Sequence, residues 1–452
     1  MAPRILLLPL FATLATVAHA QTQPDESARI LAALPSPVGQ VSPGCAVGVF
    51  RKGKVSEIVN LGAADVAAGR AINADTQFYA ASVSKQFTAV AVVQLVLQGK
   101  LKLDDDIRKF LPELPQYSRT VTVHMLLNHS SGIRDSLAML AIAGYADVSK
   151  VPYAEALRVT LAQPQTKFEP GTRYDYSNGG YLLLAEIVQR VSKQPFAEYV
   201  NQHVLKAAGM TRSFVMAGAR TSDPNFARGY TAGGGKVELS DNYPLFGGSG
   251  GLITTINDLA KWDFDVDQGH KVWTPELLRV MTAPGHFNNG VEVVRPDGIN
   301  YATGLLVGPH WFGHSGGASG FKTHYARNQG ARLGVAMLCN RGEIDPLGQV
   351  DRIVAAIDPG LPPASERAVP FSAIDGRYRS DSGVLYLLKI DPAGALKVSV
   401  LAPDGSLRKE TLFRRTPQGS YEAGSMKILP DSDSRSFVLE VSRISIPFTR
   451  TD

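Results

Sequence analysis

The segment Ser82-Val83-Ser84-Lys85 contains a hydroxyl and an amine at a spacing that suits nucleophilic catalysis. A serine attacks a carbonyl group only when a neighbouring base takes its proton. Three residues of separation place Ser82 and Lys85 on one face of a helix. The apolar residues that follow predict such a helix from Ser82 to Gln98, and its N-terminus would favour a developing negative charge.

The same spacing occurs at Ser319-Gly320-Phe321-Lys322 and at Ser406-Leu407-Arg408-Lys409. Taken alone, it is more often explained by a helix-capping serine and a lysine that reaches solvent. Only the copy at Ser82 opens a long apolar helix, and burial of a lysine lowers its pKa. Context therefore favours Ser82 and Lys85 as the reactive pair.

A second candidate segment is Tyr174-Asp175-Tyr176-Ser177-Asn178, just before a helix expected over 180–192. The Tyr176 phenol could exchange a proton, and the Asn178 carboxamide could position a substrate amide. A surface turn would explain the same residues. The spacing recurs at Tyr199 and Asn201 within an expected amphipathic helix, where packing explains Tyr199 better.

The third segment, Gly313-His314-Ser315-Gly316-Gly317, combines an imidazole, a hydroxyl and three glycines. Glycine permits close backbone approach, so an N–H group of this segment could point into a site. A β-bulge or a turn is the structural alternative.

Strands at both ends of residues 25–358, with helices between them, predict an α+β domain whose terminal strands meet in one antiparallel sheet. The expected strands are 45–50, 55–61, 322–326 and 332–340, and the expected helices are 82–98, 180–192, a helix starting after Thr255, and 347–357.

A proline-rich linker over 359–370 separates this domain from a smaller one over 371–452. Short strand-like runs with turn residues between them predict an all-β domain there. These runs cover 384–390, 396–401, 409–414 and 436–442.

Residues 1–20 read as a signal peptide that ends at Ala18-His19-Ala20, which predicts export to the periplasm or medium with a mature chain from Gln21. No other segment is apolar enough to predict a membrane span. Cys45 and Cys339 lie in strand-like runs and could form a disulfide or remain free thiols.

The net charge is +5, but the basic residues are scattered along the sequence and form no cluster. This distribution gives no support to nucleic-acid binding. The nine histidines form no metal-binding motif, so neither a metal nor a cofactor is expected. The oligomeric state is left open.

Together and in this order, the three segments resemble those of a serine hydrolase family that comprises class C β-lactamases, D-alanyl-D-alanine carboxypeptidases, D-aminopeptidases and esterases. Two further segments support the resemblance: Leu126-Leu127-Asn128-His129-Ser130-Ser131-Gly132-Ile133, and Gly247-Gly248-Ser249-Gly250-Gly251-Leu252 leading to Asp258-Leu259-Ala260. The resemblance covers residues 25–358. It implies an antiparallel sheet flanked by helices and an all-helical region, with the site between them.

By this resemblance Ser82 is the acylated nucleophile, Lys85 its base or proton relay, and Tyr176 a proton-exchanging residue. Asn178 orients the substrate, and the backbone N–H groups of Ser82 and Gly317 form the oxyanion hole. The remaining implied positions lie in the third segment: His314 as a catalytic residue, and Ser315 and Gly316 as substrate-binding residues.

Efficient β-lactamases of the family have Lys-Thr-Gly where this sequence has His314-Ser315-Gly316, so a permanent cation for a substrate carboxylate is missing. The replacement resembles that of D-aminopeptidases and several esterases. It therefore favours a D-amino-acid peptide, a small amide or an ester as substrate over a β-lactam or a D-Ala-D-Ala peptide. The C-terminal domain resembles lipocalin-like barrels appended to some relatives, with Asp375-Gly376-Arg377-Tyr378 as its opening strand.

Two other interpretations compete. An α/β-hydrolase needs a G-x-S-x-G turn followed directly by a helix, and the segments around Ser249 and Ser315 match the turn only. The second alternative is a non-catalytic, penicillin-binding-like protein that recognises cell-wall peptides.

Overall fold

The computed structural model describes residues 25–37, 41–233, 236–295, 297–366, 375–380, 383–391, 395–415, 421–424, 426–430, 436–441 and 444–451. The predicted signal peptide lies outside these residues, as do positions 367–374, where the predicted linker ends and the second domain begins. Within the described ranges, no helix is long and apolar enough to cross a membrane.

The centre of the larger domain is a seven-stranded antiparallel sheet in the order β10-β11-β12-β13-β14-β1-β2. As predicted, the N-terminal hairpin pairs with a strand from the end of the domain, because β1 lies between β2 and β14. Its strands are β1 (Cys45–Arg51), β2 (Lys54–Leu61), β10 (Asn300–Tyr301), β11 (Leu306–Val307), β12 (Trp311–Ala318), β13 (Phe321–Asn328) and β14 (Leu333–Cys339).

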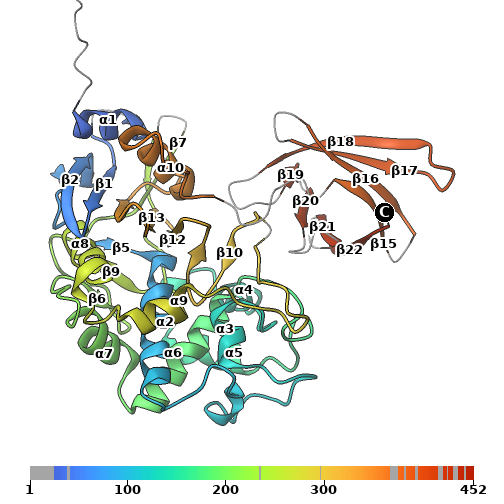
Figure 1. Ribbon diagram of the computed structural model, residues 1–452, viewed down its shortest axis with the longest axis horizontal. Helices are drawn as coiled ribbons and strands as arrows, with labels where there is room; N and C mark the ends of the chain where they lie inside the picture. The colour runs from blue at the N-terminus through green and yellow to red at the C-terminus, as the bar shows by residue number, and fades with distance from the viewer. Residues whose placement is uncertain are drawn as a thin grey trace, which may run out of the picture.

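Alternation along β1 divides its side chains between two cores. Val47 and Val49 pack on the face covered by α1 (Glu26–Ala33) and α10 (Pro346–Ile357). Ala46 and Phe50 pack on the opposite face with α8 (Ile256–Phe264). Figure 1 shows α1 and α10 together above β1 and β2, with α8 on the other side of the sheet.

Cys45 and Cys339 face each other across β1 and β14 and form a disulfide between positions 294 residues apart in the sequence. Neither cysteine is free. The sequence left open whether these cysteines form a disulfide or remain free thiols, and the structure contains the disulfide.

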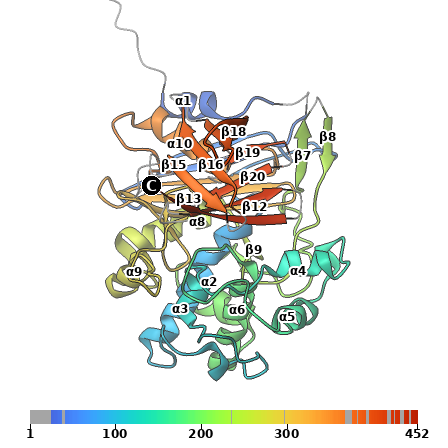
Figure 2. The same ribbon diagram turned by 90° about the vertical axis from the view of Figure 1, so that its right-hand side faces the viewer.

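Helix α2 (Ser84–Leu97) runs through the middle of an all-helical region and is buried along most of its length, as its apolar sequence predicts. Figure 2 shows this region below the sheet. The helices around α2 are α3 (Val123–Leu127), α4 (Ser136–Ile142), α5 (Tyr153–Leu161), α6 (Asn178–Ser192), α7 (Phe196–Val200) and α9 (Pro275–Thr282).

Short strands join the sheet to this region. The ones that matter for the site are β5 (Phe78–Tyr79) and β9 (Leu252–Thr254). Strand β9 lies between β5 and β6 (Phe214–Val215) and pairs with both. Two further pairs are β3 (Ala63–Asp65) with β4 (Arg70–Ala71), and β7 (Tyr230–Gly233) with β8 (Lys236–Leu239).

The C-terminal part is a closed barrel of eight antiparallel strands with its own apolar core. Its first strand, β15, pairs with its last, β22, so the predicted all-β domain is confirmed. Figure 1 shows the barrel beside β10 and separate from the helical region. Its strands are β15 (Gly376–Ser380), β16 (Leu385–Ile390), β17 (Leu396–Leu401), β18 (Leu407–Arg415), β19 (Tyr421–Ala423), β20 (Met426–Pro430), β21 (Ser436–Val441) and β22 (Ile444–Arg450).

Candidate active site

The proposed nucleophile stands on a tight turn between β5 and α2. Residues Ala81–Val83 form one turn of 3₁₀-helix, and the α-helix itself begins at Ser84. Ala81 has a φ angle of 48°, a left-handed conformation that strains a residue with a Cβ atom. This turn brings half-buried Ser82 to the mouth of α2, so the helix predicted from Ser82 begins with a tighter turn than its sequence indicates.

Lys85 is joined to three groups from different parts of the chain. Its Nζ atom lies 3.1 Å from Ser82 Oγ, 2.9 Å from Asn178 Oδ1 and 2.8 Å from the backbone oxygen of Ser249. A neutral amine fits the same geometry, because it donates two protons and accepts one from the Ser82 hydroxyl. The arrangement can therefore move a proton between Ser82 and Lys85.

Burial makes this proton transfer possible near neutral pH. Desolvation of the fully buried amine lowers the pKa of Lys85 to about 7, and the charge of Asp135 opposes that decrease. A large share of Lys85 is then neutral at physiological pH and can act as a base. An exposed lysine would be almost fully protonated there.

Asn178, at the start of α6, is held by a residue that the sequence analysis did not identify. Asp135 Oδ2 accepts hydrogen bonds from the Asn178 backbone N–H at 2.8 Å and from its carboxamide nitrogen at 2.7 Å. The carboxamide oxygen is therefore turned toward Lys85. Asp135 also caps α4, which is the only local signal that the sequence gives for it.

Tyr176 is hydrogen-bonded to Ser82, and its ring centroid lies 4.7 Å from Lys85 Nζ. Burial raises the pKa of its phenol above the ordinary value, although the Ser82 hydrogen bond and the charge of Arg295 act in the opposite direction. The phenol therefore keeps its proton and can donate it. Tyr199, which the sequence assigned to packing, is buried on α7.

His129, from the segment that supported the family resemblance, fixes the loop that carries Tyr176. Its Nδ1 atom accepts a hydrogen bond from the Ser177 backbone N–H at 3.1 Å, and its ring centroid is 4.3 Å from that of Tyr176. Burial lowers the pKa of His129 well below its usual range, so it stays neutral. The segment that contains His129 thus orients the loop that contains Tyr176.

His314 lies in β12 near Tyr176, with 6.5 Å between the ring centroids. Its Nδ1 atom contacts the Ser315 carbonyl oxygen at 2.5 Å and must carry the proton, because a carbonyl only accepts. Its Nε2 atom then accepts from the Tyr301 hydroxyl at 2.8 Å. Burial lowers the pKa of His314 well below its usual range, so this position holds no cation.

Within the described part of the chain, no hydrogen bond joins His314 to Ser82. The histidine is therefore placed beside the predicted reactive pair, with both of its ring nitrogens occupied. The Ser315 carbonyl fixes its tautomer, and Tyr301, which the sequence analysis did not identify, occupies its Nε2 atom.

Gly316 allows β12 to approach the nucleophile turn closely. A Cβ atom added there would lie 2.4 Å from the Ala80 carbonyl oxygen and 3.1 Å from the Ser82 nitrogen. Thr323 Oγ1 on β13 donates to the same Ala80 oxygen at 2.7 Å. Only glycine fits between these groups, which explains why this position has no side chain.

The position of Gly317 suits an oxyanion donor. Ala318 pairs with Phe321 across the two-residue turn Ser319-Gly320, and the closing pair of such a turn exchanges hydrogen bonds. Because hydrogen-bonded and non-hydrogen-bonded pairs alternate, the Gly317 N–H group points away from β13. Gly317 itself is exposed.

Ser315 lies on the opposite face of β12 from His314. Its Oγ atom is 2.9 Å from Nδ1 of His324 on β13. Burial lowers the pKa of His324 to about 3, so this imidazole is neutral as well. Ser315 is half-buried and can offer its hydroxyl to a ligand.

The glycine-rich segment 247–251 contributes backbone oxygens to the helix that carries Lys85. The Ser249 oxygen accepts from Lys85, and the Gly248 oxygen accepts from Thr88 Oγ1 at 2.7 Å. The segment leads into β9, and the main sheet is antiparallel. The α/β-hydrolase interpretation, which requires a helix directly after Ser249, is therefore wrong.

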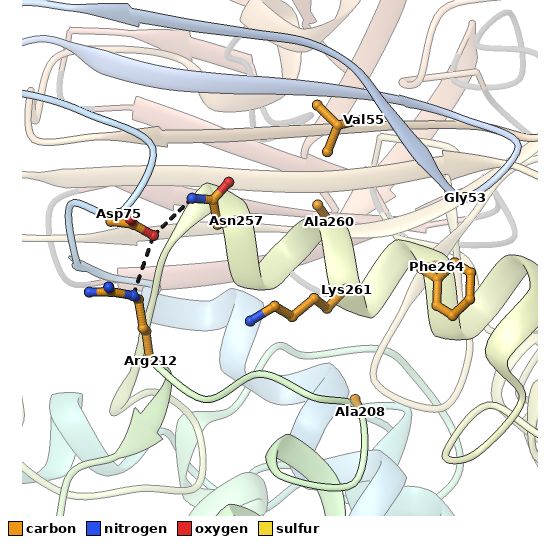
Figure 3. A pocket seen from close by; sticks show the side chains of 9 residues that line it. All are labelled: Gly53, Val55, Asp75, Ala208, Arg212, Asn257, Ala260, Lys261 and Phe264. Carbon is orange, nitrogen blue, oxygen red and sulfur yellow. Dashed lines mark hydrogen bonds and ion pairs between the residues drawn. The ribbon is translucent and has the colours of Figure 1, made fainter.

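A separate hollow of about 450 Å³ lies between the β1–β2 turn and α8. Figure 3 shows Asp75 between Asn257 and Arg212, with Lys261 and Phe264 along α8. Asp75 accepts a hydrogen bond from Asn257 at 2.8 Å and pairs with Arg212 at 3.4 Å. None of the predicted site residues lines this hollow.

Comparison with known proteins gives three kinds of match. The profile of the β-lactamase family matches residues 26–357. The D-aminopeptidase of Gluconobacter oxydans strain 621H is 27% identical over 385 residues, which cover 84% of this chain and 71% of that protein. A putative penicillin-binding protein, PbpX, of Bacillus subtilis strain 168 is 27% identical over 309 residues, which cover 67% of this chain and 72% of that protein.

Among solved structures, the octameric penicillin-binding protein homologue from Pyrococcus abyssi has the same fold. It superimposes with a TM-score of 0.63 at 23% sequence identity, over 90% of this chain and 96% of that one.

Proposed function

This chain belongs to the β-lactamase family of serine hydrolases, and from that premise we propose that it hydrolyses small amides, D-amino-acid peptides or esters through an acyl-enzyme on Ser82. The observation that carries this proposal is the hydrogen bond between Ser82 and buried Lys85, whose pKa is about 7. A hydroxyl beside a partly neutral amine has a base in reach.

In the proposed acylation step, neutral Lys85 takes the proton of Ser82 while Oγ attacks the substrate carbonyl carbon. The backbone N–H groups of Ser82 and Gly317 donate to the oxyanion. Tyr176 gives its phenolic proton to the leaving group as the carbonyl–heteroatom bond breaks. The protonated amine of Lys85 then gives its extra proton to the Tyr176 phenolate, whose ring lies beside it.

Water completes the cycle by attacking the acyl-enzyme. Its proton passes to the Tyr176–Lys85 pair, the ester bond to Ser82 breaks, and Ser82 regains its hydrogen. Asn178 orients the substrate amide, because Asp135 and Lys85 fix its carboxamide.

The neutral state of His314 supports a substrate other than a β-lactam or a D-Ala-D-Ala peptide, since no cation stands at the third-motif position. The match to the Gluconobacter D-aminopeptidase supports a D-amino-acid amide or peptide. The match to the Bacillus penicillin-binding protein keeps cell-wall peptide recognition without turnover as the second candidate.

We also propose that the protein is exported, with cleavage after Ala20. The composition of residues 1–20 supports export, and so does the disulfide between Cys45 and Cys339, a bond that persists in oxidising compartments. N-terminal sequencing of protein from the periplasm or medium tests this proposal. A start at Gln21 agrees with it, and an intact leader in cytoplasmic protein contradicts it.

The barrel, in our proposal, limits substrate size at the β10–β12 edge of the sheet. Glu366 contacts His310 in the turn before β12 at 2.7 Å, and the Pro362 oxygen accepts from Trp311 Nε1 at 2.9 Å. The segment that leads to the barrel therefore lies, at residues 362–366, beside β12, the strand that contains His314. Deletion of residues 367–452 should change kcat/KM more for large esters than for small ones, and equal changes would contradict the proposal.

Labelling with a fluorophosphonate probe followed by peptide mapping tests the central proposal. Label should attach to Ser82, and a panel of D-amino-acid amides, short esters and a chromogenic β-lactam should show turnover of the first two classes. Labelling of Ser82 without turnover of any substrate would favour the non-catalytic candidate. Label on another serine would contradict both.

A further inference from the structure

The C-terminal barrel has an outer face, formed by β15, β16, β17 and β18, on which leucines and cations lie side by side. We call it the outer barrel face. Alternate residues of a strand point to opposite sides of a sheet, so the neighbours of inward-facing residues such as Leu388 and Phe413 point outward. Cross-strand pairing places Leu385, Leu401 and Leu407 in one row of this face and Lys389, Lys397 and Leu412 in another.

The leucines of the outer barrel face are open to solvent. Leu407 is 58% exposed and Leu412 is 56% exposed. Leu385, Leu387 and Leu401 are half-buried on the same face. Single exposed apolar residues are ordinary on a protein surface, but several that gather on one face indicate a surface for contact with a partner.

The charged residues of the outer barrel face are mostly cations. Its paired positions contain one carboxylate, Glu410, and four cations, Arg377, Arg379, Lys389 and Lys397, which leaves a net charge of +3. Glu410 pairs with Lys397 at 3.0 Å. Arg379 and Lys389 are exposed and have no ion pair within the described ranges. The face therefore attracts anions.

The outer barrel face is turned away from the larger domain. Figure 1 shows β16 and β17 on the side of the barrel that is farther from the helical region. Figure 2, which views the protein from that side, shows β15 and β16 in front. A broad, flat partner can therefore reach this face without meeting the proposed active site.

We propose that the outer barrel face binds the surface of a lipid bilayer that contains anionic headgroups. The cations, among them Arg379 and Lys389, attract the headgroups, and Leu407 and Leu412 enter the apolar boundary beneath them. The larger domain and its active site then project into water. This inference goes beyond the proposed function, because it concerns where the protein is held and is independent of what it hydrolyses.

Two other partners fit the outer barrel face less well. A second copy of the chain that used the same face would bring two surfaces of charge +3 together, and like charges oppose such a contact. A soluble acidic polymer would neutralise the cations but would leave Leu407 and Leu412 in water. A bilayer with anionic headgroups offers a partner to both kinds of side chain.

Vesicle flotation tests the proposal. The protein used begins at Gln21, because the apolar segment before it would enter a bilayer by itself. Wild-type protein should bind vesicles of phosphatidylglycerol and phosphatidylcholine about tenfold more strongly than vesicles of phosphatidylcholine alone. Salt at about 0.5 M NaCl should weaken this binding, because it screens the charges. Equal binding to both kinds of vesicle, or binding to neither, would overturn the inference.

Removal of two cations tests the charge of the face. Arg379→Gln with Lys389→Gln should lower the partition coefficient for the anionic vesicles at least about tenfold, since each cation near an anionic surface contributes about fivefold. Lys54→Gln with Lys236→Gln is the matched control, because both lysines are exposed on the larger domain, on β2 and β8. Equal losses in the two double variants would show that overall charge drives binding, and would contradict the proposal.

Removal of two leucines distinguishes a bilayer from an acidic polymer. Leu407→Ser with Leu412→Ser should lower the partition coefficient about tenfold, because the leucines no longer leave water. Leu239→Ser is the control, since Leu239 is 55% exposed on β8 and should not matter. Full vesicle binding by the leucine variant, with displacement by soluble poly-L-glutamate, would identify an acidic polymer as the partner and overturn the proposal.

A tryptophan at position 407 reports directly whether the face enters the bilayer. The three native tryptophans are buried, so their emission should not respond to vesicles. With anionic vesicles, the emission of Leu407→Trp protein should move to shorter wavelength, as indole does when it leaves water. Leu239→Trp protein, the control on β8, should show no such shift. Unchanged emission from Leu407→Trp protein that floats with the vesicles would overturn the inference.

Discussion

The Nζ atom of Lys85 and the carboxamide oxygen of Asn178 lie 2.9 Å apart, although 93 residues separate them in the sequence. Asp135 holds the other end of the carboxamide at 2.7 Å. The protonation state of Lys85 is therefore coupled to the orientation of Asn178, the residue proposed to position the substrate. A charge on Asp135 raises the pKa of Lys85 while the same carboxylate fixes Asn178.

Replacement of the nucleophile should abolish turnover. Ser82→Ala is expected to lower kcat at least about a thousandfold for any substrate, because no covalent intermediate can form. Ser406→Ala is the matched control, since Ser406 belongs to another serine-x-x-lysine segment and lies in a barrel turn, where its Oγ contacts Asp404. Steady-state kinetics and circular dichroism of both variants check this expectation. Residual Ser82→Ala activity near the wild-type value would contradict it.

The activity should rise with pH through about 7. Lys85 acts as a base only when neutral, so kcat/KM should fall about tenfold per pH unit below its pKa of about 7 and level off above it. Lys85→Arg should lose activity over the whole range, because a guanidinium group stays protonated. A pH–rate profile between 5 and 9 provides the measurement. A profile that is flat across pH 7 would be incompatible with a lysine base.

Two substitutions at Asp135 should separate its charge from its hydrogen bonds. Asp135→Asn removes the carboxylate that raises the Lys85 pKa, so the acid limb of the pH–rate profile should move to lower pH. Asp135→Ala also releases Asn178 and should lower kcat about tenfold or more. Asp147→Asn, at the half-buried cap of the turn over 148–150, is the control and should leave the limb in place. An acid limb that moves to higher pH in Asp135→Asn would contradict this assignment.

A methyl group at position 316 should disrupt the site. In Gly316→Ala the new Cβ atom would clash with Ala80 and Thr323, 2.4 Å and 2.3 Å away. Overpacking of this kind costs about 1–3 kcal/mol, and the displaced β12 should lower kcat/KM about a hundredfold. Gly330→Ala is the control because its nearest contact would be 3.6 Å away. Denaturant unfolding and kinetics measure both effects, and full activity in Gly316→Ala would refute the close approach.

Loss of the disulfide should lower the free energy of unfolding more than it lowers the catalytic rate. Cys45→Ser with Cys339→Ser removes a cross-link between β1 and β14, and such losses cost about 2–5 kcal/mol. Urea unfolding, with and without reductant, measures the change in the free energy of unfolding. Reductant should affect only the wild-type protein. Equal midpoints for the two proteins without reductant would show that the bond contributes little.

The sequence predicted the elements whose signals are local. The hairpin at Cys45, the helix after Ser82 and the helix that starts after Thr255 are recognisable from a few neighbouring residues, and each is present. The β-lactamase-type fold, which the resemblance of the ordered motifs implied, is confirmed, with a sheet, a helical region and a C-terminal barrel.

The residues that the sequence analysis missed act across long distances in the chain. Asp135 and Tyr301 become significant only when helices and strands bring them to Asn178 and His314. Ser249 contributes through its backbone oxygen, which any residue type would provide. Residue type therefore gives no signal at such a position.

The pairing of β1 with β14 sets the order in which the protein becomes functional. β1 is made early in synthesis, but its partner strand follows almost 300 residues later, as the 294-residue span of the disulfide shows. Contacts of such long range slow folding, because the whole intervening chain must be present first. The growing polypeptide therefore contains Ser82 and Lys85 long before β14, the strand that completes the pairing of β1, has been made.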